Sequence, residues 1–433
     1  MAIKQLVSIA LASLTALTAL SGCSGSKGSG RASSGSSVKG ALTVCTWDFS
    51  KTQYLKDTQT AYQKLHPNVT LKFLDITSSD YLNKVTVMLA GGDASDVIDF
   101  KTIAQEDTLV SQGRIEKMDP YISKTKFDMK AYEDMEKNIQ IDNVTYALPY
   151  RYDFWVLFYN KDLFDKAKVS YPTNDMTWDD YRALAKKMTS GSGSSKIYGT
   201  YTHTWQSSTQ DWSVAEGNGP LTNGKYDSLK SYYDVFLNLQ KDGSVMDYST
   251  VKAAGGNYTG YWANQNIAMI IMGTWLPSGV LGLISSGNYS TFNWGMVNVP
   301  HSKGLQSGST TGAVTGCGIN ANSKNKDLAW NFIQWRCGEE GALVHAKDSC
   351  MPAVRTDKVL KAFTSVKGMP TDSSSQQALK PAKVSIDVPV DAHATEITNI
   401  LTEENELIMT GSETVDKGIA NMNSRVAQVK AGK

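Results

Sequence analysis

A tryptophan beside an aspartate is the first pairing in this sequence that could do binding chemistry. Leu42 to Trp47 is typical of a buried strand, and Asp48 follows it directly. Ligands of open α/β sheets bind beyond the carboxyl ends of the strands, so we expect Trp47 and Asp48 to contribute to a ligand site. An indole offers a flat apolar face and a carboxylate accepts hydrogen bonds from hydroxyls, a combination that suits a sugar. The alternative for Trp47 is an ordinary core aromatic.

Aromatic side chains are frequent elsewhere as well. The chain has 10 tryptophans and 20 tyrosines, residues that suit half-wet surfaces because each carries a polar group on an apolar body. They indicate an amphipathic ligand, and several such rings would favour an oligosaccharide over a monosaccharide. Four of them could either extend the site or pack a domain edge, and the sequence leaves both roles open: Trp205, Trp212, Tyr261 and Trp262.

Catalysis and metal binding have no comparable support. The five histidines are scattered, no HExxH or Gly-x-Ser-x-Gly motif occurs, and no cysteine has the spacing of a metal site. We therefore predict a protein that is not an enzyme, with no catalytic residues, no metal and no cofactor. A secreted glycoside hydrolase is the alternative. It needs two carboxylates facing the scissile bond, and carboxylates are too common here to decide the question.

The charge balance argues against nucleic acid as a partner. Lysines and arginines number 43 and aspartates and glutamates 42, so the chain has no basic field to hold phosphates. Its 433 residues suffice for two domains of ordinary size, and we expect a monomer. After the N-terminus, no apolar run is long enough to be a transmembrane helix.

The N-terminal residues have the pattern of an export signal. Lys4 is the only charge before an apolar run over 6–20, which is short for a membrane span but suits a signal-peptide core. The small residues before Cys23 resemble the lipobox of bacterial lipoproteins, whose cysteine is lipid-modified. We expect a signal peptide over 1–22, a Gly/Ser-rich tether over 23–40, and an extracytoplasmic protein anchored to the cell membrane by lipid on Cys23. A signal peptide cleaved near an incidental cysteine is the alternative.

Four further cysteines could form disulfides. Cys45, Cys317, Cys337 and Cys350 allow two disulfides in three connectivities, among which the sequence does not choose. Cys45 lies inside an apolar strand pattern, where a buried free thiol is favoured.

Strand patterns and helical periodicity alternate along the chain, near the N-terminus and again after residue 228. This alternation predicts parallel βαβ units and an α/β fold with a second α/β lobe. Thr177-Trp178-Asp179-Asp180 predicts a helix that begins with a capping box. The predicted strands cover 42–47, 69–74, 97–100 and 268–272, and the predicted helices cover 52–65, 81–89 and 228–240.

Several motifs are spread over the chain after the predicted tether. They are Leu89 to Val97, Tyr146-Ala147-Leu148-Pro149, Leu157 to Phe164, Thr177 to Tyr181, Ala268 to Trp275 with its Gly-x-Trp ending, and Gly318-Ile319-Asn320 with Ser323-Lys324-Asn325. Together they resemble the family 1 extracellular solute-binding proteins, the carbohydrate-binding components of ABC importers, which include maltose-binding protein. One departure is Ser95, where the family usually has proline.

The resemblance implies a two-lobed periplasmic-binding-protein-like fold with a hinge and an interlobe ligand cleft. The lobes would close on a carbohydrate, and the loaded protein would deliver it to the permease subunits of an ABC transporter. Residues 41–155 would form the first part of the N-terminal lobe, 156–310 the C-terminal lobe, and 311–433 the return segments that complete both. An adhesin that binds glycans without transport would share these features.

The resemblance also points to two binding residues. Trp275 matches the family's stacking tryptophan, and Asp153 falls where maltose-binding protein has a ligand-contacting glutamate. We expect Asp153 to accept hydrogen bonds from sugar hydroxyls. The alternative is an ion pair with Arg151, which we expect to be geometrically poor on the ground that adjacent strand residues face opposite ways.

Overall fold

Eight strands form one connected sheet within residues 38–132 and 140–432, the part of the chain that the structure, a computed structural model, describes. The predicted signal peptide, Cys23 and most of the tether lie outside these residues. The strand order is β2-β1-β3-β7-β4-β5, with β6 beside β4 and β8 beside β7. The strands are β1 (Gly40–Trp47), β2 (Val69–Ile76), β3 (Val97–Phe100), β4 (Leu148–Asn160), β5 (Met269–Gly273), β6 (Trp294–Val297), β7 (Ser309–Ile319) and β8 (Lys383–Ile386).

The N-terminal strands and helices form the predicted βαβ units. Strand β1 pairs in parallel with both β2 and β3, and helices α1 (Gln53–Leu65) and α2 (Tyr81–Ala90) lie between these strands in the chain. In α1 the residues Tyr54, Leu55, Thr58 and Tyr62 are buried, at the spacing of one helix face. The α/β class predicted from this alternation is confirmed.

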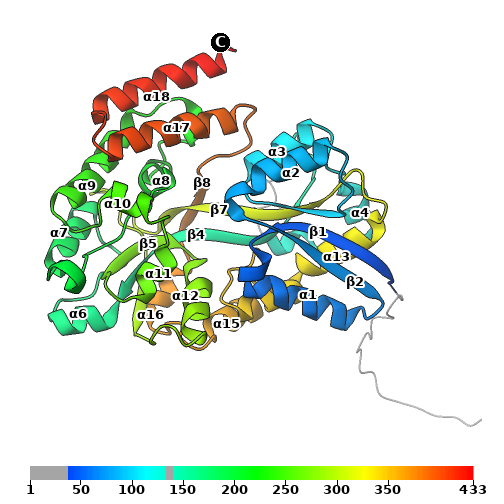
Figure 1. The fold of residues 1–433 in the computed structure, drawn as a ribbon, viewed down its shortest axis with the longest axis horizontal. Helices are drawn as coiled ribbons and strands as arrows, with labels where there is room; N and C mark the ends of the chain where they lie inside the picture. The colour runs from blue at the N-terminus through cyan, green and yellow to red at the C-terminus, as the bar shows by residue number, and fades with distance from the viewer. Residues whose placement is uncertain (1–37, 133–139, 433) are drawn as a thin grey trace, which may run out of the picture. The chain divides into compact units, whose positions relative to one another are not determined.

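Two long antiparallel strands, β4 and β7, connect the two halves of the sheet (Figure 1). One end of β7 pairs with β3, and the far end of β4 pairs with β5 and β6. Twelve of the thirteen residues of β4 are buried, as expected for a strand covered on both faces. The predicted boundaries at 155/156 and 310/311 fall inside β4 and β7, so each lies in a strand that serves both halves.

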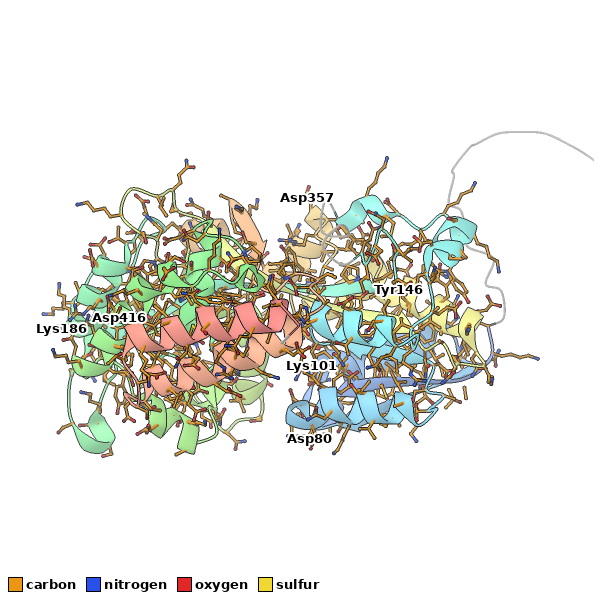
Figure 2. All side chains as sticks on the ribbon, turned by 90° about the horizontal axis from the view of Figure 1, so that it is seen from above. Asp80, Lys101, Tyr146, Lys186, Asp357 and Asp416 are labelled. Carbon is orange, nitrogen blue, oxygen red and sulfur yellow. The ribbon has the colours of Figure 1, made fainter. Side chains whose placement is uncertain are left out.

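Helices cover the sheet, and the last two, α17 and α18, pack on each other at the C-terminus (Figure 1). Charged side chains such as Lys186 and Asp416 project outward at the periphery, whereas Lys101 lies near the middle of the molecule (Figure 2). The remaining helices are α3 (Ile103–Ser111), α4 (Asp119–Thr125), α6 (Lys161–Ala167), α7 (Trp178–Met188), α8 (Ser207–Ala215), α9 (Lys230–Lys241), α10 (Tyr248–Ala253), α11 (Tyr258–Ala263), α12 (Leu276–Ser285), α13 (Lys326–Arg336), α14 (Glu339–Lys347), α15 (Asp357–Thr364), α16 (Ser373–Ala378), α17 (Ala394–Met409) and α18 (Val415–Lys430).

Two local predictions can be checked directly. The capping box of α7 is confirmed: the Asp180 amide donates to Thr177 Oγ1 over 3.2 Å, and the Thr177 amide donates to Asp180 Oδ2 over 3.1 Å. Cys45 is a buried free thiol, as predicted, and burial raises its pKa to about 11. Cys317, Cys337 and Cys350 are also buried and free, with 3.5 Å between the Sγ atoms of Cys317 and Cys337.

Candidate ligand-binding cleft

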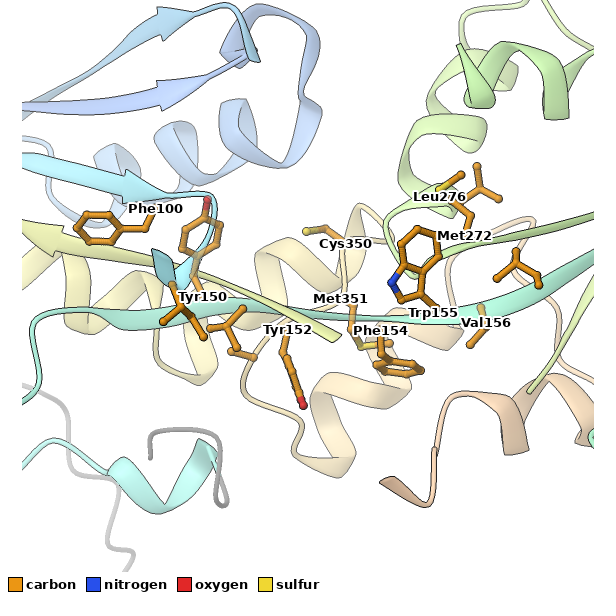
Figure 3. Packing of buried hydrophobic residues seen from close by; sticks show 14 of the residues in the cluster. Phe100, Tyr150, Tyr152, Phe154, Trp155, Val156, Met272, Leu276, Cys350 and Met351 are labelled. Atoms are coloured by element: carbon orange, nitrogen blue, oxygen red, sulfur yellow. The ribbon is translucent and has the colours of Figure 1, made fainter. Parts of the chain in front are cut away.

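A cleft of about 1020 Å³ lies where β4 and β7 run past the ends of β1 and β5. Side chains of Arg151, Asp153 and Trp155 line it from β4, because alternate residues of a strand share one face. Figure 3 shows Trp155 and Phe154 extending to opposite sides of this strand. Gly312 and Ala313 of β7 also line the cleft.

Trp47 and Asp48 line the cleft from the end of β1, and their contact with a ligand stays a prediction. The Trp47 ring is partly exposed and packs edge-on against Tyr81, with 5.1 Å between ring centroids. Lys101 Nζ lies 5.4 Å from the Trp47 ring centroid. Asp48 begins the short 3-10 helix Phe49–Lys51 with a left-handed φ of 47°, and its Oδ1 accepts the Ser78 amide at 3.2 Å.

Trp275 lines the cleft from the end of β5, directly before α12. Its ring lies over Gly273, where an added Cβ would come within 2.0 Å of the ring. The glycine of the Gly-x-Trp motif therefore makes room for the tryptophan. Trp155 stands edge-on to this ring, with 5.5 Å between centroids, so one side of the cleft is an aromatic wall.

Trp205 extends the aromatic wall. It is 38% exposed, lines the cleft, and stacks on His203 with 3.9 Å between ring centroids. Tyr258 stands edge-on to Trp205 at 5.7 Å and lines the same cleft. Burial lowers the pKa of His203 to about 4, so the imidazole beneath Trp205 is neutral at physiological pH.

Three other candidate aromatics do not line the cleft. Trp212 is 1% exposed, and its indole N–H donates to the Ser208 carbonyl at 2.9 Å, so both its apolar body and its polar group are satisfied inside. Trp262 is also 1% exposed and packs against Phe292. Tyr261 is half-buried against Tyr201. Trp212 and Trp262 therefore have the packing role in this structure, whereas a part for Tyr261 in ligand binding stays a prediction.

Asp153 forms an ion pair with Arg151, although the sequence led us to expect poor geometry for that pair. Arg151 Nη2 lies 2.6 Å from Asp153 Oδ2, and the two side chains are 12% and 2% exposed. The expectation was wrong because residues 151 and 153 are two apart and therefore share a face of the strand. The other carboxylate oxygen accepts Thr274 Oγ1 at 2.9 Å. Asp153 still lines the cleft, but both of its oxygens already have partners.

Sequence reasoning missed several lining residues. Trp155 could have been found, since it follows Asp153 by two positions on the same strand. No such signal marks Tyr258, Asp211 or Asp387. Asp211 comes to the cleft from α8, Asp387 from the end of β8 and Tyr258 from the start of α11, all distant from β4 in the sequence. Burial and the neighbouring Asp387 raise the pKa of Asp211 well above its usual range.

The cleft offers stacking surfaces and hydrogen-bonding groups. Within the described ranges, no group of three or more His, Cys, Asp or Glu side chains is placed to hold a metal ion. Among the described residues, no helix is both long and apolar enough to cross a membrane. An aromatic wall and charged groups suit non-covalent capture of a polar molecule with apolar faces.

The fold is periplasmic-binding-protein-like, a class of ligand-capturing proteins, and it matches known structures over nearly the whole chain. A sugar transporter protein from Rhizobium etli, solved in an open conformation, is 37% identical, with a TM-score of 0.77 over 89% of this chain and 99% of that one. An ABC substrate-binding protein from Listeria monocytogenes in complex with cycloalternan is 21% identical, with a TM-score of 0.76 over 91% of this chain and 100% of that one.

The family follows from sequence as well. The model of the bacterial extracellular solute-binding protein family matches residues 48–342, and the chain belongs to that family. A galactooligosaccharide-binding protein from Bacillus subtilis is 24% identical, over 75% of this chain and 76% of that protein. The family consists of binding proteins, so the chain is not an enzyme and the glycoside hydrolase alternative is set aside.

Proposed function

We propose that this protein captures a carbohydrate, in particular an oligosaccharide, in the cleft and delivers it to the permease subunits of an ABC transporter. The observation that carries the proposal is the pairing of Trp47 on one side of the cleft with Trp275 on the other, each at the end of a strand. Two separated aromatic platforms in a cleft of about 1020 Å³ suit several linked sugar rings better than one. The similar proteins support the same ligand class: they include a sugar transporter protein, a protein in complex with cycloalternan and a galactooligosaccharide-binding protein.

The roles of the lining residues follow from their chemistry. Trp47, Trp275 and Trp205 would stack on the apolar faces of sugar rings. Asp48 and the remaining lone pairs of Asp153 would accept hydroxyl hydrogen bonds, and Arg151 would hold Asp153 in place. Trp212, Tyr261 and Trp262 do not line the cleft and would have no part in this site.

The ligand would be held by hinge closure. Residues 41–155 and 156–310, completed by 311–433, would act as two lobes that move about the crossing strands β4 and β7. A ligand that contacts Trp47 on one lobe and Trp275 on the other favours the closed form, since those joint contacts exist only there.

A glycan-array screen followed by calorimetry tests the proposal. We expect an oligosaccharide to bind in the micromolar range or tighter, whereas amino acids and short peptides do not bind. Recovery of the sugar unchanged after long incubation is the control for hydrolysis. Failure of every glycan to bind would contradict the proposed ligand class.

Membrane anchoring through Cys23 is part of the proposal. Cys23→Ala should move the protein from the membrane fraction to the soluble extracytoplasmic fraction without changing sugar affinity, because the Gly/Ser-rich tether separates anchor and cleft. Continued membrane retention of the variant would reject the anchor and leave the binding proposal intact.

A further inference from the structure

Two carboxyl groups, Asp211 and Asp387, meet at one edge of the cleft. Asp211 belongs to α8, and its Oδ2 accepts Thr311 Oγ1 of β7 at 2.9 Å. Asp387 follows β8, whose Ile386 pairs with Gly312 of β7, the next residue after Thr311. Both aspartates line the cleft, and the charge of Asp387 acts on the Asp211 carboxyl. The register of β7 and β8 thus holds the two acids side by side.

One oxygen of this pair lacks a partner at hydrogen-bonding geometry. Asp211 is 1% exposed, and its Oδ1 forms no hydrogen bond although it is buried; besides Thr311, the Trp155 indole lies close enough to act on the same carboxyl. Buried polar atoms are nearly always paired, so an unpartnered carboxylate oxygen in a cleft wall points to a group that a ligand supplies.

The nearby basic groups are occupied elsewhere. Arg151 is paired with Asp153 at 2.6 Å. Lys101, which lines this cleft together with Asp387, donates to the carbonyl and the hydroxyl of Ser78 at 2.9 and 2.6 Å. Lys51 lies 3.9 Å from Asp48. Among the described residues, no lysine or arginine contributes to the shift of either carboxyl's pKa.

We propose that Asp211 and Asp387 form an acidic subsite that selects a sugar ring bearing a protonated amino group. This inference rests on the proposed function and specifies the substrate class of the same cleft. An ammonium group supplies both a hydrogen-bond donor for the free Oδ1 and the positive charge that the pair lacks. A neutral hydroxyl supplies only the donor.

The pair of carboxyls also sets how many protons are released when an ammonium group binds. In the proposed subsite, desolvation and mutual repulsion disfavour two charged carboxyls, so one of them would carry a proton in the free protein. Burial raises the pKa of Asp387, as burial and Asp387 together raise that of Asp211. When an ammonium group binds, both carboxyls would be carboxylates, and the proton that one of them carried would pass to the buffer. The net charge of the subsite, with its ligand, is then unchanged at minus one.

Matched glycans on the full-length protein provide the test. The array presents hexose oligosaccharides in hydroxyl, N-acetyl and free-amino forms, among them α-1,4- and β-1,4-linked trimers of glucose, N-acetylglucosamine and glucosamine. Calorimetry of the best matched pair is run at pH 7 in phosphate and in Tris, whose ionisation enthalpies differ. The variants are Asp211→Asn and Asp387→Asn, and the control is Asp327→Asn, whose side chain is 87% exposed.

The expected result is an amino form that binds about tenfold or more tightly than its hydroxyl counterpart and releases up to one proton. Both cleft variants should lose the preference and the proton release, and the control should keep them. A melting curve without sugar verifies that each variant is folded, and the proton release of the unaltered protein does not depend on the variants. Equal or tighter binding of the neutral form would overturn the inference alone. Binding of no glycan at all would overturn the proposed function as well.

Discussion

Asp153 is held by two partners at the floor of the cleft, which makes it a structural residue as well as a candidate ligand contact. Asp153→Asn would leave the guanidinium of Arg151, 12% exposed, without its counter-charge. We expect the free energy of unfolding to fall by about 3 kcal/mol, since removing one member of a buried pair strands the other. Urea denaturation measures the change. Asp416→Asn breaks an ion pair in which Asp416 is 76% exposed, and should cost under about 1 kcal/mol. Equal effects of both substitutions would contradict this assignment.

His203 predicts a pH dependence of stability. Its folded-state pKa of about 4 lies below the unfolded value of about 6.5, because burial disfavours the charged ring. Between these values the unfolded state binds more protons, so the free energy of unfolding decreases as the pH falls through that window. The loss is on the order of 2–3 kcal/mol from this group. Denaturant titrations at several pH values should show a flatter profile for His203→Gln, though not a level one, since burial also lowers the pKa of His345. An unchanged profile would refute the assignment.

Individual site residues were predictable where strand ends or motifs marked them. Trp47, Asp48 and Trp275 lie at the ends of strands whose apolar patterns are plain in the sequence, and all three line the cleft. The sequence could not distinguish the buried rings of Trp212 and Trp262 from rings that line the cleft. Whether an aromatic ring is buried depends on its tertiary neighbours and not on its local sequence pattern.

At the scale of elements, a buried ion pair ties helix α13 to strand β3. Arg336 Nη1 lies 2.6 Å from Asp99 Oδ1, and both side chains are fully buried. Thr46 Oγ1 of β1 donates to Asp99 Oδ2 at 2.7 Å, and the guanidinium lies 3.7 Å from the Tyr150 ring centroid. The pair therefore joins α13 to the strands that end at the cleft.

Arg336→Gln should destabilise the fold by about 3–5 kcal/mol, because Asp99 would remain as an uncompensated buried charge. Urea denaturation monitored by circular dichroism gives the value. Lys326→Gln in the same helix is the matched control, since Lys326 and its partner Glu116 are 33% and 32% exposed. A loss no larger than that of the control would show that the Asp99 pair contributes little.

The N-terminal elements were predictable because their apolar residues recur with the periods of strands and helices. The predicted segments 42–47, 52–65 and 81–89 differ from β1, α1 and α2 by two residues or fewer at each end. Strand β8 and the approach of Asp387 to Asp211 were not predictable, since β8 has four residues and pairs with β7 about 70 positions away in the sequence. Local patterns carry no information on such long-range pairing.

At the scale of the whole molecule, the proposed hinge predicts compaction on ligand binding. Small-angle scattering of the protein saturated with the sugar found on the array should give a smaller radius of gyration than the free protein, because the closed form is stabilised by contacts to both sides of the cleft. The double variant Trp47→Ala/Trp275→Ala, which should bind the sugar far more weakly, should keep the same radius of gyration at that sugar concentration. An unchanged radius for the saturated protein would exclude large closure while leaving binding intact.

The central claim, that Trp47 and Trp275 capture a sugar from opposite sides of one cleft, is tested most directly by calorimetry of the two alanine variants. Each should weaken binding of the array-selected oligosaccharide by on the order of 2 kcal/mol, about 30-fold, because each removes one stacking surface. Tyr171→Ala is the control, since Tyr171 is 39% exposed and absent from the cleft lining. Its affinity should match that of the unaltered protein. Trp47→Ala and Trp275→Ala variants that melt normally and bind the sugar with unchanged affinity would contradict the claim.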